Sequence, residues 1–349
     1  MDRAPLGISV FAPELRQTVA LAAAADQAGI DVWTSELFNR TATVPLAVAA
    51  HVTSRVRIGS SVMYGVGRSP LMLAAEARDL DQLSGGRFVL GLGNGTRRMI
   101  SDWHGLDPAA PALRMEELIP LLRRLFRLHL EPVIHSGRFY SVKVHPIADG
   151  APPLREQVPI VTGGVSPRMI ESAGRVADGF IGHPIMSADY LDAVVRPALQ
   201  RGAAATGRAL AEERFELAAM VLCSANDDER TARLDAASQL AFYGTVKSYD
   251  SAFDHHGFGA ETTAIRTAFR AGDLDAMRAA VSDRMIDTLA IAGTPEDVAA
   301  RLWARSAALD HLIVSGPTNG VPAERVEANL RGLIAVLGED QYARTAIPG

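Results

Sequence analysis

Three glycines at alternate positions form a pattern in this sequence that suggests a binding site. Gly91, Gly93 and Gly95 end the apolar run RFVLGLGNG. In dinucleotide-binding folds a G-x-G-x-x-G turn lets the backbone approach a pyrophosphate at the start of a helix. Here the third glycine position of that motif holds Thr96, and the following stretch TRRMISDWHGLDPAAP contains a glycine and two prolines, which exclude a long regular helix. The spacing therefore does not fit a dinucleotide site.

A second glycine turn, Thr162-Gly163-Gly164, lies between an apolar run and a helix start at Ser166-Pro167. Backbone N–H groups in such a turn, together with the helix N-terminus, are a known way to hold a phosphate. The same pattern is also typical of an ordinary tight strand-to-helix turn. The residues alone leave both interpretations open.

The elements that would position these turns form a repeating pattern. Short apolar runs alternate with amphipathic helical stretches, which is typical of parallel strands joined by helices. We expect eight strands, at residues 6–11, 32–35, 56–63, 87–93, 158–164, 178–184, 215–223 and 311–316. This count predicts a (β/α)8 TIM barrel, and a doubly wound sheet is the second interpretation.

Two stretches depart from the strand–helix alternation. We expect a single barrel domain over residues 1–349, with excursions at about 97–157 and 226–290. The first excursion contains HSGRFYSV, which predicts a hairpin, and the second is mostly helical by pattern. Loops of this kind are where barrel enzymes vary their chemistry, so we expect the excursions to set the substrate.

In a barrel, the residues that follow each strand converge on one site. Here that rim holds few charges, and Glu36 is the only acid close to a strand end, so the paired carboxylates of a glycosidase are missing. The first strand lacks the paired histidines of metal-dependent hydrolases. A rim rich in glycine, small hydroxyls and backbone suits a large planar cofactor better than hydrolysis.

The composition narrows the class of protein. The chain has 349 residues, a formal net charge of -5 and a sequence pI near 6.0, which favour neither nucleic acid nor an anionic membrane as a partner. No apolar run reaches membrane-spanning length, and the start MDRAPLGISV lacks the pattern of a signal peptide, so we expect a cytoplasmic enzyme. Neither of its lysines, Lys143 and Lys247, lies in an apolar strand, which argues against Schiff-base chemistry. The one cysteine, Cys223, lies in an apolar strand and favours a packing role.

Two long segments resemble a known family. The stretch GSSVMYGVGRSPLMLAAEARDLDQLSGGRFVLGLGNG and the later VPIVTGGVSPRMIESAGRVADGFIGH are similar to the luciferase-like flavin-dependent oxidoreductases, in particular the branch that uses the deazaflavin coenzyme F420. The similarity runs over nearly the whole chain. It implies a (β/α)8 barrel with insertions, a flavin in the mouth of the barrel and a homodimer.

The resemblance also assigns cofactor contacts. Ser61-Val62 matches the position where the family often has a non-proline cis peptide, a bulge that presses on the central flavin ring and is followed by Met63. The implied contacts after the fourth strand are Gly93, Asn94, Gly95 and Thr96, and those that hold the phosphate tail are Thr162, Gly163 and Gly164. On this interpretation, the glycines are present because side chains would collide with the ring system.

The catalytic assignment is less direct, because many members carry Asp-His after the second strand and this sequence has Glu36-Leu37. The candidates for proton transfer are Glu36, Tyr64, His104, His183 or water, of which we take Glu36, Tyr64 and His183 as catalytic. Candidate substrate contacts are Asn39, Trp103 and His104. We expect Glu36 otherwise to cap a helix or pair with Arg40.

Several functions remain open. The first is an F420-dependent oxidoreductase that transfers hydride between the deazaflavin and a small organic substrate. FMN could occupy the same barrel in a monooxygenase, and the missing histidine is also compatible with a flavin-binding protein without turnover. A barrel enzyme acting on a phosphorylated metabolite through the Thr162–Gly164 turn is the last alternative. His255 and His256 have no other ligand nearby in the sequence, so we expect surface or lid residues and no metal.

Overall fold

The computed structural model describes residues 4–146, 152–304 and 309–345. Its main sheet is built from parallel strands, hydrogen-bonded in the order β11-β10-β12-β1-β2-β3-β5-β8-β9, and β9 pairs in addition with β10. Without β11, eight strands follow one another in a closed order, which is that of a (β/α)8 barrel. The barrel prediction is confirmed, and the doubly wound sheet is wrong.

All eight predicted strands are present, and their bounds differ from the prediction by a few residues. The barrel strands are β1 (Leu6–Ser9), β2 (Asp31–Thr34), β3 (Ile58–Ser60), β5 (Phe88–Gly93), β8 (Ile160–Gly163), β9 (Gly179–Gly182), β10 (Glu216–Ala225) and β12 (His311–Ser315). The third predicted strand is broken into β3 and β4 (Met63–Tyr64), of which β4 pairs with β5. β11 (Ala290–Gly293) was not predicted.

The chain forms two compact units, one from the described parts of 1–32, 182–195 and 217–349, the other from 33–181 and 196–216. The expectation of a single domain stays a prediction. Among the described residues, no helix is both long and apolar enough to span a bilayer.

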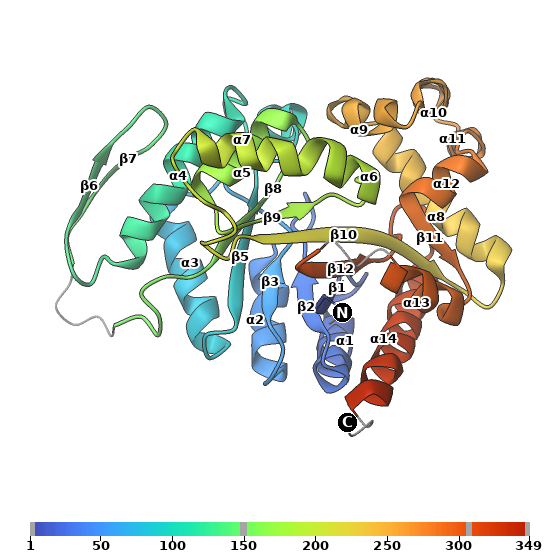
Figure 1. Ribbon diagram of the computed structural model, residues 1–349, viewed down its shortest axis with the longest axis horizontal. Helices are drawn as coiled ribbons and strands as arrows, with labels where there is room; N and C mark the ends of the chain where they lie inside the picture. The colour runs from blue at the N-terminus through green and yellow to red at the C-terminus, as the bar shows by residue number, and fades with distance from the viewer. Residues whose placement is uncertain (1–3, 147–151, 305–308, 346–349) are drawn as a thin grey trace. The chain divides into compact units, whose positions relative to one another are not determined.

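The unit of residues 33–181 and 196–216 carries the glycine turns. Its helices are α2 (Thr43–Val52), α3 (Pro70–Leu83), the π-helix η1 (Met99–Trp103), α4 (Pro111–Phe126), α5 (Pro167–Val176) and α7 (Arg196–Ala204) (Figure 1). Two of them begin with a Ser-Pro pair, as predicted at Ser166-Pro167. Ser69 and Ser166 accept hydrogen bonds from the N–H groups of Met72 and Met169, and each is followed by proline at the first helical position.

The first excursion contains the predicted hairpin, β6 (Val133–Ser136) paired antiparallel with β7 (Ser141–Val144), at the left of Figure 1. The carboxylate of Glu117, on α4, accepts hydrogen bonds from the backbone N–H groups of residues 138–140 and contacts His135 Nε2 at 3.0 Å. These hydrogen bonds and the His135 contact lower the pKa of Glu117 against the opposing effect of burial. The carboxylate thereby fixes the hairpin turn to α4.

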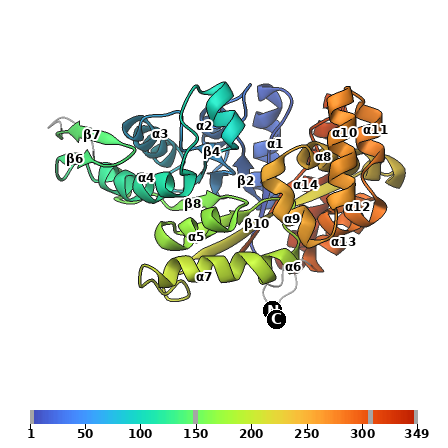
Figure 2. The same ribbon diagram turned by 90° about the horizontal axis from the view of Figure 1, so that it is seen from above.

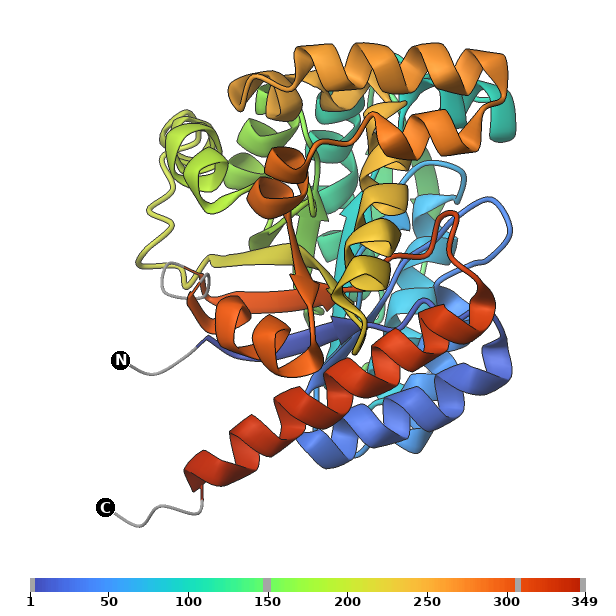
Figure 3. The ribbon, with the colours of Figure 1, turned by 90° about the vertical axis from the view of Figure 1, so that its right-hand side faces the viewer.

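The other unit holds the helical excursion predicted at 226–290. Its helices are α1 (Leu15–Ala28), α6 (Ala188–Tyr190), the π-helix η2 (Leu191–Val195), α8 (Glu229–Gly244), the 3-10 helix η3 (Lys247–Tyr249), α9 (Asp250–His255), α10 (Gly259–Ala271), α11 (Leu274–Ala279), α12 (Asp283–Leu289), α13 (Pro295–Ala304) and α14 (Ala323–Thr345). Figure 2 shows α10 and α11 beside α8, and Figure 3 shows α14 packed along α1. Cys223 is buried in β10, as its packing role requires.

Candidate functional site

The predicted bulge at Ser61-Val62 lies between β3 and β4, and its peptide bond is cis. Neighbouring backbone fixes it on both sides. Ser61 N–H donates to Thr34 O at 2.7 Å, Ser35 Oγ donates to Ser61 O at 2.8 Å, and Glu36 N–H donates to Val62 O at 3.2 Å. The segment that follows β2 therefore holds both carbonyls of the bulge.

The side chain of Val62 lies between two of the glycines. A β-carbon on Gly93 would lie 2.6 Å from Val62 Cγ2, and one on Gly163 would lie 3.1 Å from Val62 Cγ1. Register places Tyr64 opposite Gly93 and Met63 opposite Leu92, which in turn is opposite Thr162. The residues assigned to the cofactor from β4, β5 and β8 thus lie side by side.

The explanation of the glycines needs correction, because a β-carbon on Gly91, Gly93 or Gly164 would meet protein atoms and not only a ring system. A β-carbon on Gly91 would overlap the carbonyl oxygen of Ser60, and one on Gly164 would lie 2.7 Å from Met169 Cβ. Gly95 has a φ of 68°, a left-handed conformation that favours glycine. Close packing and backbone conformation account for these glycines without a ligand.

Three buried polar atoms in this region have no hydrogen-bond partner among the described residues. They are Ser61 Oγ, Asn94 Oδ1 and Thr162 Oγ1, on side chains that are at most 7% exposed. The amide of Asn94 is already oriented, because its Nδ2 donates to Pro111 O at 2.7 Å. An unsatisfied buried polar group costs about 1–3 kcal/mol, so these atoms indicate a polar ligand or water. The heteroatom edge of a flavin or deazaflavin fits this requirement.

Glu36 is the most constrained of the predicted catalytic residues. Its carboxylate accepts hydrogen bonds from Tyr64 N–H at 2.9 Å and from Arg68 Nη1 and Nη2 at 2.9 and 2.6 Å. Arg68 also pairs through Nε with Glu76 at 3.1 Å, and Thr43 Oγ1 donates to the same Glu76 at 3.0 Å. Glu36 therefore pairs with Arg68, a residue that sequence reasoning missed, and not in the expected pair with Arg40.

Hydrogen bonds and ion pairs with Glu36 and Glu76 fix the guanidinium of Arg68 in position. Burial lowers the pKa of Arg68, but the hydrogen bonds and charges of Glu36 and Glu76 outweigh that effect and raise it overall. The guanidinium is thus a permanent cation between two carboxylates. Its position before the Ser69-Pro70 helix start was the available signal, since a charged residue there lies near the rim.

The remaining predicted residues of this unit lie in two aromatic pairs. Tyr64 is 5% exposed, and its ring meets that of His104 edge-on at 5.6 Å between centroids. Trp103 and the partly exposed Phe38 form a second edge-on pair at 5.5 Å. Asn39 lies between Leu37 and Arg40, which form a tight bridge, and its side chain is exposed. Thr96 Oγ1 accepts from Met99 N–H at 3.2 Å, just before the helical residues that lead into η1.

His183 belongs to the other unit, where it follows β9. Its ring lies 4.8 Å from that of Tyr243 and 4.6 Å from that of Tyr249. Burial lowers the pKa of His183 to about 3 and raises that of Tyr249 to about 12. The imidazole is therefore neutral at physiological pH and is not a ready source of a proton.

The depressed pKa of His183 predicts a dependence of stability on pH. The folded state disfavours protonation, so its contribution to stability is complete above the ordinary pKa of 6.5 and is lost as the pH falls toward 3. We expect a loss approaching about 1.4 kcal/mol per pH unit in this range from this residue. Urea unfolding of wild type and His183→Phe should show a shallower pH dependence in the variant. Titration of the His183 ring near its ordinary pKa by proton NMR would contradict this.

The packing of the Val62 side chain between Gly93 and Gly163 gives a second prediction. Gly93→Ala should push Val62 out of place, because overpacking typically costs about 1–3 kcal/mol. We expect flavin binding to weaken by tenfold or more, which corresponds to about 1.4 kcal/mol or more. Val62→Ala in the same chain removes the obstructing methyl groups and should restore most of the binding. Fluorescence titration measures both. Equal loss in the single and double variants would show that Gly93 acts in another way.

The strand order defines a TIM-barrel protein, with a cis bulge beside glycine-bearing strand ends. The comparisons with known proteins agree with this class. Residues 3–311 match the family model described as luciferase-like monooxygenase, and the chain belongs to this family. Its relatives and structural neighbours are oxidoreductases and monooxygenases.

Three similar proteins illustrate the range of the family. A putative coenzyme F420-dependent oxidoreductase of Mycobacterium tuberculosis is 29% identical over 297 residues, which cover 80% of this chain and 84% of the relative. The coenzyme F420-dependent tetrahydromethanopterin reductase of Methanopyrus kandleri shares the fold with a TM-score of 0.74 at 24% identity, over 95% and 98% of the two chains. The FMN complex of a type II Baeyer–Villiger monooxygenase from Pseudomonas putida has a TM-score of 0.65 at 17% identity, over 97% and 99%.

Proposed function

We propose that this protein is an F420-dependent oxidoreductase that transfers hydride between the deazaflavin and a small organic substrate. The observation that carries the proposal is the cis Ser61-Val62 bulge, together with three buried polar atoms, on Ser61, Asn94 and Thr162, that lack a hydrogen-bond partner among the described residues. The F420-dependent relative named above supports this choice of cofactor. When bound, the deazaflavin supplies a ring carbon that accepts or donates hydride.

The residues of this chain would bind and orient that ring. Val62, fixed by the backbone around it, would form the wall behind the ring, with Ser61, Met63, Asn94, Gly95 and Thr96 around its edge. Thr162, Gly163 and Gly164, before the capped start of α5, would hold the phosphate tail. Gly93 would contribute by making room for Val62.

The contacts distinguish the candidates for proton transfer. The carboxylate of Glu36 is fully engaged by Arg68 and Tyr64 N–H, so we assign it the positioning of the segment that follows the bulge. His183 is held neutral by burial. Tyr64 and His104, whose rings meet edge-on, remain as the pair that exchanges a proton with the substrate.

Cofactor binding and turnover test the proposal. Purified protein should bind F420 in the micromolar range or tighter, quench its fluorescence, and exchange hydride with at least one candidate alcohol, aldehyde or enone. Tight FMN binding with no F420 binding would favour an FMN-dependent monooxygenase. The FMN-bound Baeyer–Villiger monooxygenase named above has a similar fold. Binding of F420 without any hydride exchange would leave only a flavin-binding protein.

Substrate binding should depend on the exposed aromatic pair. The side chains of Trp103 and Phe38 are 46% and 71% exposed. Large aromatic rings are mostly buried, so the exposure of this pair indicates a function other than packing. We expect Trp103→Ala to raise KM by roughly tenfold, because removing a stacked aromatic contact costs about 0.5–1.5 kcal/mol beyond its buried area. Affinity for F420 should be unchanged. A lost F420 affinity with normal KM would place Trp103 at the cofactor instead.

A homodimer in the cytoplasm stays a prediction. Analytical ultracentrifugation of the purified chain measures the oligomeric state directly.

A further inference from the structure

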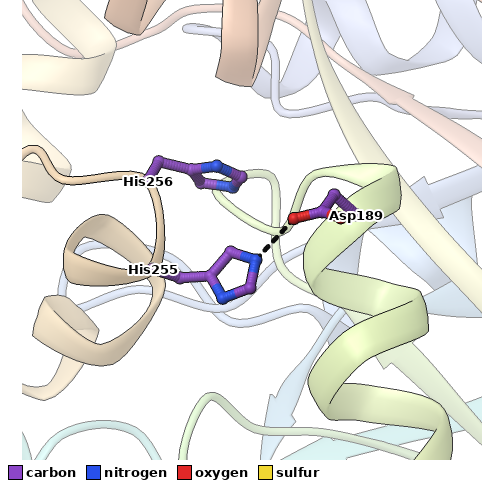
Figure 4. Close-up of side chains that lie close together, drawn as sticks. All are labelled: Asp189, His255 and His256. Atoms are coloured by element: carbon purple, nitrogen blue, oxygen red, sulfur yellow. Dashed lines mark hydrogen bonds and ion pairs between the residues drawn. The ribbon is translucent and has the colours of Figure 1, made fainter.

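Three side chains with metal-binding atoms gather in the unit that does not carry the candidate flavin site. They are Asp189, on the short helix α6, and His255 and His256, at the end of α9, all in the same unit (Figure 4). One ligand atom from each lies within 4.8 Å of the other two. We propose that Asp189, His255 and His256 form a binding site for a divalent transition-metal ion, with Zn²⁺ as the best match.

The fold prepares the three side chains for such an ion. His255 Nε2 lies 2.6 Å from Asp189 Oδ2, so a carboxylate oxygen and an imidazole nitrogen already face each other where a cation would sit. His256 Nε2 contacts Ser187 Oγ at 2.9 Å, and that hydroxyl also accepts from Tyr190 N–H at 3.1 Å. Hydrogen bonds like the one between His256 and Ser187 orient metal-binding histidines and fix their tautomer.

The ligand set indicates the class of ion. Two imidazoles and one carboxylate, with a position left for water, are typical of Zn²⁺ and of related divalent ions, whereas Mg²⁺ and Ca²⁺ prefer oxygen ligands only. In tetrahedral Zn²⁺ sites the bonds are about 2.0–2.1 Å long, so ligand atoms lie about 3.3 Å apart. The 2.6 Å pair must therefore open slightly, which the 75% exposed side chain of Asp189 allows.

Arg284 is a positively charged group beside the cluster. It donates to His256 O at 2.9 Å and lies over the ring of Phe258 at 4.1 Å. Its charge opposes an incoming ion, and the carboxylate of Asp189 offsets it.

A bound ion would join two segments that are distant in sequence. Residues 187–189 follow β9 by a few residues, and α9 follows Tyr249 directly. His183 and Tyr249, whose rings pack together, lie on these same two segments. An ion at the cluster would thus join the helical excursion to the segment after β9, beside the contact between His183 and Tyr249.

Metal binding by the intact protein tests the proposal. Chelator-treated wild type should bind about one Co²⁺ per chain with the visible absorption of a tetrahedral N,O site, and Zn²⁺ should displace it. Zn²⁺ should also raise the thermal midpoint and protect His255 and His256 from diethylpyrocarbonate, measured by peptide mass spectrometry. Asp189→Asn and His255→Gln should each weaken binding by more than roughly tenfold.

His51→Gln serves as the matched control, because His51 is exposed at the end of α2 and lies in the other unit. It should bind Co²⁺ as wild type does. The proposal is overturned if wild type shows neither the absorption nor protection of the two histidines, or if folded Asp189→Asn and His255→Gln bind like the control.

Discussion

Gly91→Ala is expected to destabilise the protein severely, by more than about 3 kcal/mol, because the added β-carbon would overlap a backbone atom. That atom is the carbonyl oxygen of Ser60 on the neighbouring strand. The same Ser60 binds Gly91 twice, since its Oγ donates to Gly91 O at 2.8 Å and accepts from Gly91 N–H at 2.9 Å. Neither strand can move without breaking these bonds. Chemical unfolding, or the soluble yield where the variant does not fold, measures the effect.

Gly332→Ala is the control for this prediction. Gly332 lies in α14, and a β-carbon there would meet nothing within 4 Å. The substitution should stabilise the protein by about 0.5–1 kcal/mol, because alanine loses less conformational freedom in a helix than glycine. A Gly91→Ala variant as stable as wild type would mean that β3 and β5 are further apart than described.

Arg68→Met should cost about 3–5 kcal/mol, because it leaves a buried carboxylate without its counter-charge. The side chain of Glu36 is only 7% exposed and would keep a single hydrogen bond, from Tyr64 N–H. We expect F420 affinity to fall as well, because the segment from Glu36 to Tyr64 carries the bulge. Denaturant unfolding and fluorescence titration measure the two effects.

The exposed pair of Arg98 and Asp102 provides the comparison. Its side chains are 86% and 52% exposed, so Arg98→Met should change stability by at most about 0.5 kcal/mol. Glu36→Gln combined with Arg68→Met should recover part of the loss, since no charge is then buried. If the double variant were no more stable than Arg68→Met alone, burial of the Glu36 charge would not be the cause.

Hydrophobic patterning predicted the barrel because its strands are short, apolar and separated by capped helices. β5 is buried along its whole length. Ser69 and Ser166 cap helices that each begin with a proline. β11 could not be predicted in the same way. It has four residues and begins where α12 ends, so the apolar run DTLAIAG reads as a continued helix.

The candidate site was only partly predictable, because contacts between distant residues are not encoded in local spacing. The cis bond at Ser61-Val62 was expected from the resemblance, and the structure has it. The pairing of Glu36 with Arg68 joins residues that no periodic pattern relates. His255 and His256 lacked a third ligand in the sequence because Asp189 is 66 residues away.

The position of Val62 between Gly93 and Gly163 has a consequence for protein engineering. Three codons, well separated in the gene, together specify one wall, and enlarging either glycine alone meets a methyl group of Val62. Mutagenesis that changes one position per clone is therefore expected to weaken flavin binding at Gly93, and less strongly at Gly163, where the contact is longer. A combinatorial library that varies positions 62, 93 and 163 together would give access to walls of different shape, and with them to bulkier or altered flavin analogues.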